Sequence, residues 1–269
     1  MSKQFLWKDL DLAKPPLRSH ASRSAHDSCL PGWTSPDIGK EPALSFKCHR
    51  FRIAGIPIQV LDSADSQAAE LVALELQRDF YELNKIQFAN ADIVIDIGGH
   101  IGLFSIFLAL RFPDIVIHSF EPFPENSDLF RRNLALNSVN NVQLHPMAVS
   151  GDGRFLEMVT NPRNSGGATC NSQTLSHCRT NMIPSTTLDN VFNSLGIQCC
   201  KLLKIDCEGS EYEVLLSTHN LSRVKYLCGE FHTNAFLASQ GYSIEQLRVY
   251  CETFLTSDRI AVRSCRMSE

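Results

Sequence analysis

Four acidic residues, each at the end of an apolar run, are the residues of this chain best placed to do chemistry. They are Asp96, Glu121, Asp206 and Glu230, and His232 follows the last of them by two positions. The carboxyl ends of parallel strands meet at one crevice of an open sheet, so we expect these side chains to converge there. Carboxylates brought together repel one another unless cations, hydrogen bonds or raised pKa values relieve them. The expected crevice therefore suits a positively charged ligand.

A glycine-rich turn follows the first of these runs and includes Gly98, Gly99 and Gly102. Glycine allows a tight turn and a close approach of the backbone to a ligand. Glu121, at the end of the next run, can accept hydrogen bonds from both ribose hydroxyls. Together these features predict a nucleoside site, whereas the glycines alone would also fit a plain strand-to-helix connection.

The turn departs from the dinucleotide fingerprint G-x-G-x-x-G, because it reads D-x-G-G-H-x-G from Asp96. A carboxylate at that position would repel a pyrophosphate but suits a ligand that carries an ammonium group. The D-x-G-x-x-x-G arrangement resembles the first motif of class I S-adenosylmethionine-dependent methyltransferases. His100 stands where that superfamily often has Gly or Asn, which tolerate a positive φ angle better than other residues do.

A second motif makes the resemblance more specific. Residues 201–211, K-L-L-K-I-D-C-E-G-S-E, are similar to the K-x-D-x-E-G-x-E signature of FkbM-type methyltransferases. Thr187-Leu188-Asp189 before it and Glu230-Phe231-His232 after it complete a series of motifs in the family's order. The resemblance implies a seven-stranded Rossmann-like sheet and methyl transfer from S-adenosylmethionine, in relatives usually to a hydroxyl oxygen.

Residues for the cofactor follow from these motifs. We expect Asp96 and the turn at residues 98–102 to hold its amino-acid end, Glu121 to bind its ribose, and Tyr81 to pack against it. The predicted cofactor-binding residues are Tyr81, Asp96, Gly98, Gly99, His100, Gly102, Glu121, Pro122, Ala148 and Asp206.

Methyl transfer needs an aligned acceptor and a group that removes its proton. His232 is the first choice for this base because an unperturbed imidazole titrates near neutrality, and Asp206 is the second. Glu230 completes the expected catalytic group. The alternative role for His232 is to cap the strand end through a backbone hydrogen bond.

The same three residues, Asp206, Glu230 and His232, are also a candidate metal site. Their strand ends are similar to those that carry the magnesium ligands of catechol O-methyltransferases. A divalent ion such as Mg²⁺ would lower the pKa of the acceptor hydroxyl. Carboxylates at strand ends also serve as hydrogen-bond acceptors, so both interpretations stay open.

Composition limits the partners. The 269 residues are 43% hydrophobic with a formal net charge of -4, which fits one α/β domain plus a peripheral segment. Neither a basic stripe nor a polybasic run is present, so we expect no nucleic-acid or membrane partner. The acceptor is expected to be a small molecule, natural product or glycan. A homodimer is left open.

The ten cysteines are scattered and include no Cys-x-x-Cys pair, which predicts reduced core residues and no structural zinc site. The N-terminal residues do not resemble a secretory signal, and no apolar run approaches membrane-spanning length. These features predict a soluble, cytoplasmic protein.

The predicted strands and helices alternate along the chain, which indicates a doubly wound, mostly parallel α/β fold that positions the site. We divide the chain into an irregular arm (1–45), a hairpin and helix (46–90), and a methyltransferase core (91–269) with a loop insertion at 150–184. The predicted hairpin covers 46–61, with strands at 93–97, 115–120, 142–149, 202–206, 224–230 and 259–263. Helices are predicted at 67–83, 102–111, 124–136, 188–195, 210–217 and 244–254.

Two other functions compete with the methyltransferase. A nicotinamide-dependent oxidoreductase would also hold a nucleoside, but the glycine spacing and Asp96 count against it. A degenerate methyltransferase fold acting as a binding module would keep the architecture without the chemistry. Retention of all the acidic strand ends and His232 makes that module less expected.

Overall fold

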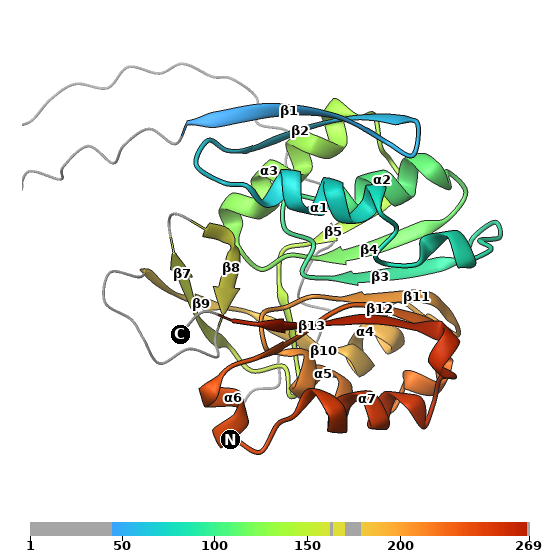
Figure 1. Ribbon diagram of the computed structural model, residues 1–269, viewed down its shortest axis with the longest axis vertical. Coiled ribbons are helices and arrows are strands. Elements are labelled where there is room, and N and C mark those ends of the chain that lie inside the picture. Colours follow the sequence, from blue (N-terminus) through green and yellow to red (C-terminus); the bar gives the residue numbers. More distant parts are fainter. Residues whose placement is uncertain (1–44, 162–163, 170–178, 268–269) are drawn as a thin grey trace, which may run out of the picture. The chain divides into compact units, whose positions relative to one another are not determined.

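Six parallel strands form the central sheet of the computed structural model, which describes residues 45–161, 164–169 and 179–267 (Figure 1). The strand order is β13-β12-β11-β3-β4-β5, and every neighbouring pair is parallel. Their bounds are β3 Ile93–Ile97, β4 Val116–Phe120, β5 Val142–His145, β11 Cys200–Ile205, β12 Val224–Thr233 and β13 Ile260–Arg266.

The chain winds outward from β3 through β4 to β5, and later from β11 through β12 to β13. The order therefore switches direction between β3 and β11, which is where open α/β sheets bind ligands. Figure 1 shows α2 and α3 on one side of the sheet and α4, α5 and α7 on the other. The doubly wound α/β fold is as expected, but the prediction of seven strands is wrong. Only six apolar runs were recognised in the sequence, and the seventh strand came from the family resemblance.

Burial on both faces explains why these runs form strands. Val94 and Ile95 of β3, and Leu202 and Leu203 of β11, are completely buried, as expected for parallel strands between two layers of helices. The helices are α1 Ala68–Gln77, α2 Leu103–Arg111, α3 Pro124–Leu136, α4 Leu188–Ser194, α5 Glu211–Ser217, α6 Ala235–Ser239 and α7 Ile244–Glu252. Single 3₁₀ turns are η2 Leu83–Lys85, η3 Leu221–Arg223 and η4 Ser257–Arg259. No helix among these described residues is both long and apolar enough to cross a membrane.

A hairpin of β1 (Phe46–Ile53) and β2 (Ile56–Ser63) packs against α3. The side chain of Asn133 satisfies both backbone groups of Leu61, accepting from its N–H at 2.7 Å and donating to its C=O at 3.0 Å. The predicted helix 67–83 ends early, because Asp79 and Glu82 take positive φ angles of 54° and 53°. Tyr81 therefore lies in a turn after α1 rather than on the helix.

The predicted strand 142–149 is two strands. Pro146 cannot donate a backbone hydrogen bond, and after it β6 (Ala148–Ser150) leaves the main sheet to pair with β10 (Ser185–Thr187). Part of the predicted loop insertion is also regular, since β7 (Leu156–Asn161), β8 (Asn164–Thr169) and β9 (Arg179–Ile183) form a small antiparallel sheet. The predicted irregular arm, apart from Ser45, lies outside the described residues.

Strand β12 is longer than predicted and runs to Thr233. Glu230 and His232 therefore lie within a paired strand, opposite Arg263 and Cys265 of β13. Because residues two apart in a strand point to the same face, the side chains of Glu230 and His232 lie on the same face of the sheet.

The turn after β3 generates a stability prediction. Gly98 has a φ angle of +83°, and a Cβ there would lie 1.8 Å from the carbonyl oxygen of Asp206. Gly241 has nearly the same φ angle, +85°, but nothing within 4 Å of its Cβ position. Gly98→Ala should lower the free energy of unfolding by about 3 kcal/mol or more, and Gly241→Ala by only about 1 kcal/mol. Urea unfolding measures both. Equal losses would show that backbone φ alone, and not contact with β11, constrains Gly98.

Candidate active site

A cavity of about 280 Å³ opens at the switch point, beyond the carboxyl ends of β3, β4 and β11. Nine of the predicted site residues line it: Tyr81, Gly98, Gly99, His100, Glu121, Pro122, Ala148, Asp206 and Glu230. Three do not line it: Asp96, Gly102 and His232. The cavity therefore brings most of the expected site together, and the exceptions each have another structural role.

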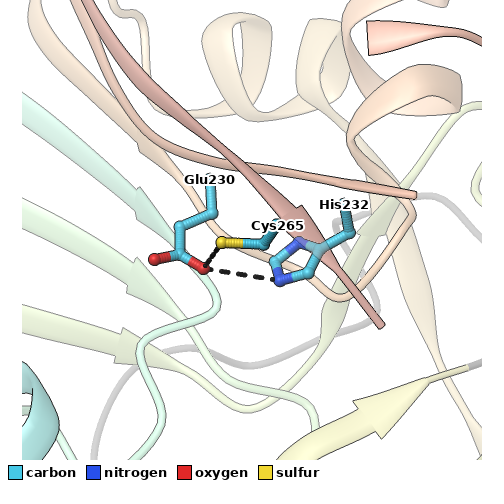
Figure 2. A group of neighbouring side chains, drawn as sticks. All are labelled: Glu230, His232 and Cys265. Atoms are coloured by element: carbon cyan, nitrogen blue, oxygen red, sulfur yellow. Dashed lines mark hydrogen bonds and ion pairs between the residues drawn. The ribbon is translucent and has the colours of Figure 1, made fainter. Parts of the chain in front are cut away.

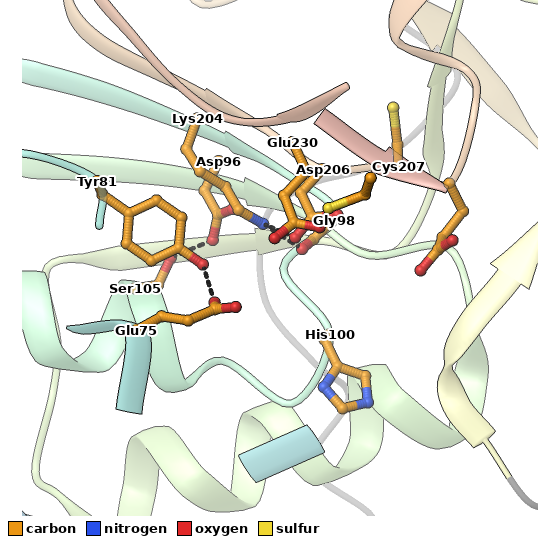
Figure 3. A network of polar contacts seen from close by, with 12 residues as sticks. Glu75, Tyr81, Asp96, Gly98, His100, Ser105, Lys204, Asp206, Cys207 and Glu230 are labelled. Carbon is orange, nitrogen blue, oxygen red and sulfur yellow. Dashed lines mark hydrogen bonds and ion pairs between the residues drawn. The ribbon is translucent and has the colours of Figure 1, made fainter. Parts of the chain in front are cut away.

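Lys204, which the sequence interpretation missed, is the buried cation of the site (Figure 3). Its Nζ donates to the carbonyl oxygen of Gly98 at 2.7 Å and lies 3.2 Å from Asp96 Oδ1 and 3.7 Å from Asp206 Oδ2. Burial disfavours its charge, but the two carboxylates outweigh that cost and raise the pKa of Lys204. A lysine within an otherwise apolar strand was the sequence signal, since such a charge needs a partner when it is buried.

Asp96 is a counter-ion rather than a wall of the cavity. It is completely buried, and its Oδ2 accepts hydrogen bonds from Ser105 Oγ at 2.7 Å and Ser119 Oγ at 2.9 Å. Its Oδ1 faces Lys204. Asp96 is therefore set back from the cavity and paired with Lys204, and its expected contact with the ammonium group of a cofactor stays a prediction.

The glycines are needed for packing within the protein. A Cβ at Gly99 would lie 2.2 Å from Ser119 Oγ, and one at Gly102 would lie 2.1 Å from the Phe130 ring. Gly102 does not reach the cavity, so the plain strand-to-helix connection accounts for it. His100 has a φ angle of 49°, which confirms the expected left-handed backbone at that position.

Glu121 is held by three donors at the end of β4. Its Oε2 accepts from the His100 N–H at 2.8 Å, and its Oε1 accepts from the Phe123 N–H at 3.0 Å and from Asn126 Nδ2 at 3.1 Å. Burial raises the pKa of Glu121 to about 7, although these hydrogen bonds oppose the shift. Burial also lowers the pKa of His100 to about 4, so its imidazole is neutral at physiological pH.

Tyr81 and Glu75 form the wall on the side of α1. The Tyr81 hydroxyl donates to Glu75 Oε2 at 2.7 Å, and its ring packs edge-on against Phe104. Glu75 Oε1 lies 2.5 Å from an Arg263 nitrogen of β13. These contacts fix the Tyr81 ring at the cavity, where it was expected to meet the cofactor.

His232 lies behind the cavity wall, surrounded by carboxylates. Its Nδ1 is 2.9 Å from Glu211 Oε1, and its Nε2 faces Glu230, Glu208 and Asp206 oxygens at 3.6, 3.7 and 4.0 Å. Burial disfavours the imidazolium, but the surrounding acids raise the pKa of His232 to about 9. The near-neutral pKa assumed for a histidine base is therefore wrong here, and a catalytic role for His232 stays a prediction.

Two further acids of the motif, Glu208 and Glu211, lie in different parts of the site. Glu208 precedes α5 and lines the cavity, and burial raises its pKa to about 7. Glu211 is completely buried and accepts from the Cys207 N–H at 2.9 Å and the Gly209 N–H at 3.0 Å. Glu211 therefore fixes the loop after β11.

Glu230 is bound to β13. Its two oxygens are engaged by Arg263 and by the Cys265 thiol, whose Sγ lies 2.8 Å away (Figure 2). Among the described residues, two groups have ligand atoms within 4.8 Å of one another: Glu230, His232 and Cys265, and Asp206, Glu208 and His232. The predicted metal trio of Asp206, Glu230 and His232 is neither of these groups.

Residues 96–252, more than half of the chain, match the model of the Methyltransferase FkbM domain. The chain belongs to this family. It is 25% identical over 150 residues to Methyltransferase 1 of Beauveria bassiana, covering 48% of this chain and 59% of that protein. It is 25% identical over 185 residues to the 31-O-demethyl-FK506 methyltransferase FkbM of Streptomyces tacrolimicus, covering 56% and 70%.

Methyltransferase sdnD of Sordaria araneosa is 26% identical over 151 residues, covering 45% of this chain and 58% of that protein. The chain therefore spans less than two thirds of the length of this relative and of Methyltransferase 1. Superposition on a precorrin-6y C5,15-methyltransferase of Geobacter metallireducens gives a TM-score of 0.35 at 15% identity over 56% of each chain. The M. jannaschii TYW2 complex with AdoMet gives 0.25 at 19% identity over 39% and 44%. The family assignment rests on the domain match, not on these partial superpositions.

Lys204 generates the prediction for this site. Lys204→Met leaves Asp96 buried without its cation and should lower the free energy of unfolding by about 3–5 kcal/mol. The control is Lys201→Met on the same strand, where the half-buried pair with Asp92 at 3.4 Å should contribute under about 1 kcal/mol. Adding Asp96→Asn to Lys204→Met should recover part of the loss in urea unfolding. A Lys204 variant as stable as the Lys201 variant would contradict the central ion pair.

Proposed function

We propose that this protein transfers a methyl group from S-adenosylmethionine to a hydroxyl oxygen of a small molecule, natural product or glycan. The observation that carries the proposal is an acidic cavity at the switch point of an FkbM-family sheet. Five carboxylates line it, opposed by one lysine: Glu75, Glu121, Asp206, Glu208 and Glu230, with Lys204. A cofactor with a sulfonium and an ammonium suits this lining, whereas a pyrophosphate would be repelled.

The cofactor half of the site is built around Glu121. Three N–H donors already orient its carboxylate, and the two oxygens offer about four acceptor positions in total. About one acceptor position therefore remains for a ribose hydroxyl. Tyr81 and Phe104 offer apolar ring surface on the other side of the cavity. Asp206, rather than Asp96, is the strand-end carboxylate that faces the cavity and suits the ammonium group.

The acceptor half is built from the loop after β11 and from β12. Bound S-adenosylmethionine would supply an activated methyl group on a positively charged sulfur. The chain has to align a hydroxyl with that methyl and take up its proton. Asp206, Glu208 and Glu230 all line the cavity and can accept a hydrogen bond from the hydroxyl. His232 lies behind them, so we assign it the role of holding these carboxylates.

The nature of the acceptor is supported by charge and by a relative. An acidic lining disfavours nucleic acids and anionic membrane surfaces, whose phosphates it would repel. One relative is named as a 31-O-demethyl-FK506 methyltransferase, which supports transfer to an oxygen. Cytoplasmic location and a homodimer stay predictions.

The function is tested with purified protein, S-adenosylmethionine, and a panel of acceptors that carry hydroxyl or amino groups. We expect saturable cofactor binding by calorimetry and methylated products by mass spectrometry only from hydroxyl acceptors. Cofactor binding without transfer to any acceptor would support the binding-module alternative. Binding of a nicotinamide dinucleotide in place of S-adenosylmethionine would support the oxidoreductase and overturn the proposal.

A second prediction concerns Glu121. Glu121→Gln keeps the side-chain shape but loses the charge, and should weaken S-adenosylmethionine binding by about 1.5–3 kcal/mol, the scale of charged hydrogen bonds. Glu125→Gln, an exposed neighbour on α3, is the control and should bind normally. An unchanged affinity in folded Glu121→Gln would remove Glu121 from the ribose site.

The same variant has a pH signature. The ionised form of Glu121 accepts hydrogen bonds from hydroxyl groups. The pKa of Glu121 without a ligand is about 7. Wild-type affinity should therefore be about tenfold weaker at pH 6 than at pH 8, because only about a tenth of the protein is ionised at Glu121 at the lower pH. The Gln variant should show a weaker dependence, to which Glu208 with its pKa of about 7 still contributes, and equal pH profiles for both proteins would argue against the assignment.

A further inference from the structure

One ring nitrogen of His232 lies among carboxylates at distances too long for hydrogen bonds. Its side chain is only 6% exposed, and its Nδ1 is fixed by Glu211. The other nitrogen, Nε2, has carboxylate oxygens at 3.6, 3.7 and 4.0 Å, all beyond the 2.7–3.2 Å typical of N–H···O hydrogen bonds. The Nε2 atom thus faces three carboxylates, and none of these oxygens lies within hydrogen-bonding distance.

The spacing of these atoms suits an ion between them. Ligand atoms of Asp206, Glu208 and His232 all lie within 4.8 Å of one another. A divalent ion with bonds of about 2.1 Å holds neighbouring ligand atoms about 3.0–3.4 Å apart. Binding of an ion would bring these ligand atoms closer together than the structure places them.

Glu230 is poorly placed to bind a cation. One of its oxygens is engaged by the Arg263 guanidinium, which also repels a cation. The other accepts from the Cys265 thiol (Figure 2). Glu208 shares the cavity wall with Asp206, on the loop that follows β11.

Glu211 supplies the support that a metal-bound histidine requires. Ligating histidines usually donate their second ring N–H to a carboxylate or carbonyl, which sets the tautomer and orients the ring. Completely buried Glu211 stands 2.9 Å from His232 Nδ1 and also accepts backbone N–H groups of Cys207 and Gly209. One side chain therefore orients the histidine and fixes the loop that carries Asp206 and Glu208.

We propose that Asp206, Glu208 and His232 form a binding site for one divalent transition-metal ion, with Glu211 orienting the histidine. Two carboxylates and an imidazole suit Mn²⁺ or Zn²⁺ better than Mg²⁺, which prefers oxygen ligands alone. This set replaces Glu230 of the sequence prediction with Glu208. The existence of the site is independent of the cofactor, whereas its use in catalysis, beside the acceptor hydroxyl, rests on the proposed function.

The test is Mn²⁺ binding by the full chain, stripped of metal with a chelator and dialysed, with no cofactor or acceptor present. Calorimetry and electron paramagnetic resonance should show one saturable equivalent. Glu208→Gln should weaken Mn²⁺ binding by at least about tenfold, and Glu211→Gln by about 10–100-fold, the usual scale for loss of a supporting carboxylate. Glu230→Gln should change it by less than about threefold. The matched control is Glu213→Gln, on the same helix as Glu211. Glu213 pairs with Arg154, so this variant should have no effect on Mn²⁺ binding.

Opposite results would overturn the proposal. They are the absence of saturable Mn²⁺ binding, or binding that Glu208→Gln leaves intact, or binding that Glu230→Gln abolishes instead. Because the Glu208 side chain is 24% exposed, its Gln variant should still unfold cooperatively, which a thermal melt verifies. Cofactor affinity is measured separately on the stripped protein. S-adenosylmethionine binding without Mn²⁺ binding would refute the metal site alone, and the reverse would refute the proposed cofactor alone.

Discussion

The ammonium of Lys204 lies between two carboxylates that end adjacent strands, and the rest of the site depends on that arrangement. Asp96 of β3 pairs in register with Lys204 of β11, and Asp206 follows Lys204 by two positions, so the sheet itself brings these three charges together. Without a cation, burial would force at least one of them to take up a proton. Lys204 also donates to the carbonyl of Gly98, which links the glycine turn to β11. One buried charge thus holds together the two halves of the sheet where the strand order reverses.

Two further cationic side chains serve the neighbouring strands in the same way. His232 and Arg263 balance Glu211 and Glu230, as Lys204 balances the acids of β3 and β11. Burial raises the pKa values of the cavity carboxylates Glu208 and Glu121 to about 7. A cationic ligand would stabilise the ionised forms of both. The interior is therefore neutralised by the fold, and the acidity that remains faces the cavity.

Sequence patterns predicted the six strands of the central sheet, and most of the predicted site residues line the cavity, because both depend on local features. Runs such as Ile93–Ile97 are apolar on both faces, and their ends share an edge in any parallel sheet. The failures involve partners that are distant in the chain. Gly98 packs against Asp206, and the pKa of His232 depends on Glu211, neither of which a local pattern includes. Lys204 could have been recognised, since a lysine in a buried strand requires a counter-ion.

Asp96 shows that the position of a residue in a motif does not by itself give its contacts. The acid at the end of the first strand and the glycines after it occupy the positions that the family pattern assigns to the cofactor. In this structure their nearest partners are Lys204, two serines, Phe130 and the Asp206 carbonyl. Such residues act on a ligand through the shape and charge of the turn they support. A ligand in the cavity would instead contact the side chains that line it. Among these, Glu121 and Asp206 carry the charge that a cationic cofactor needs.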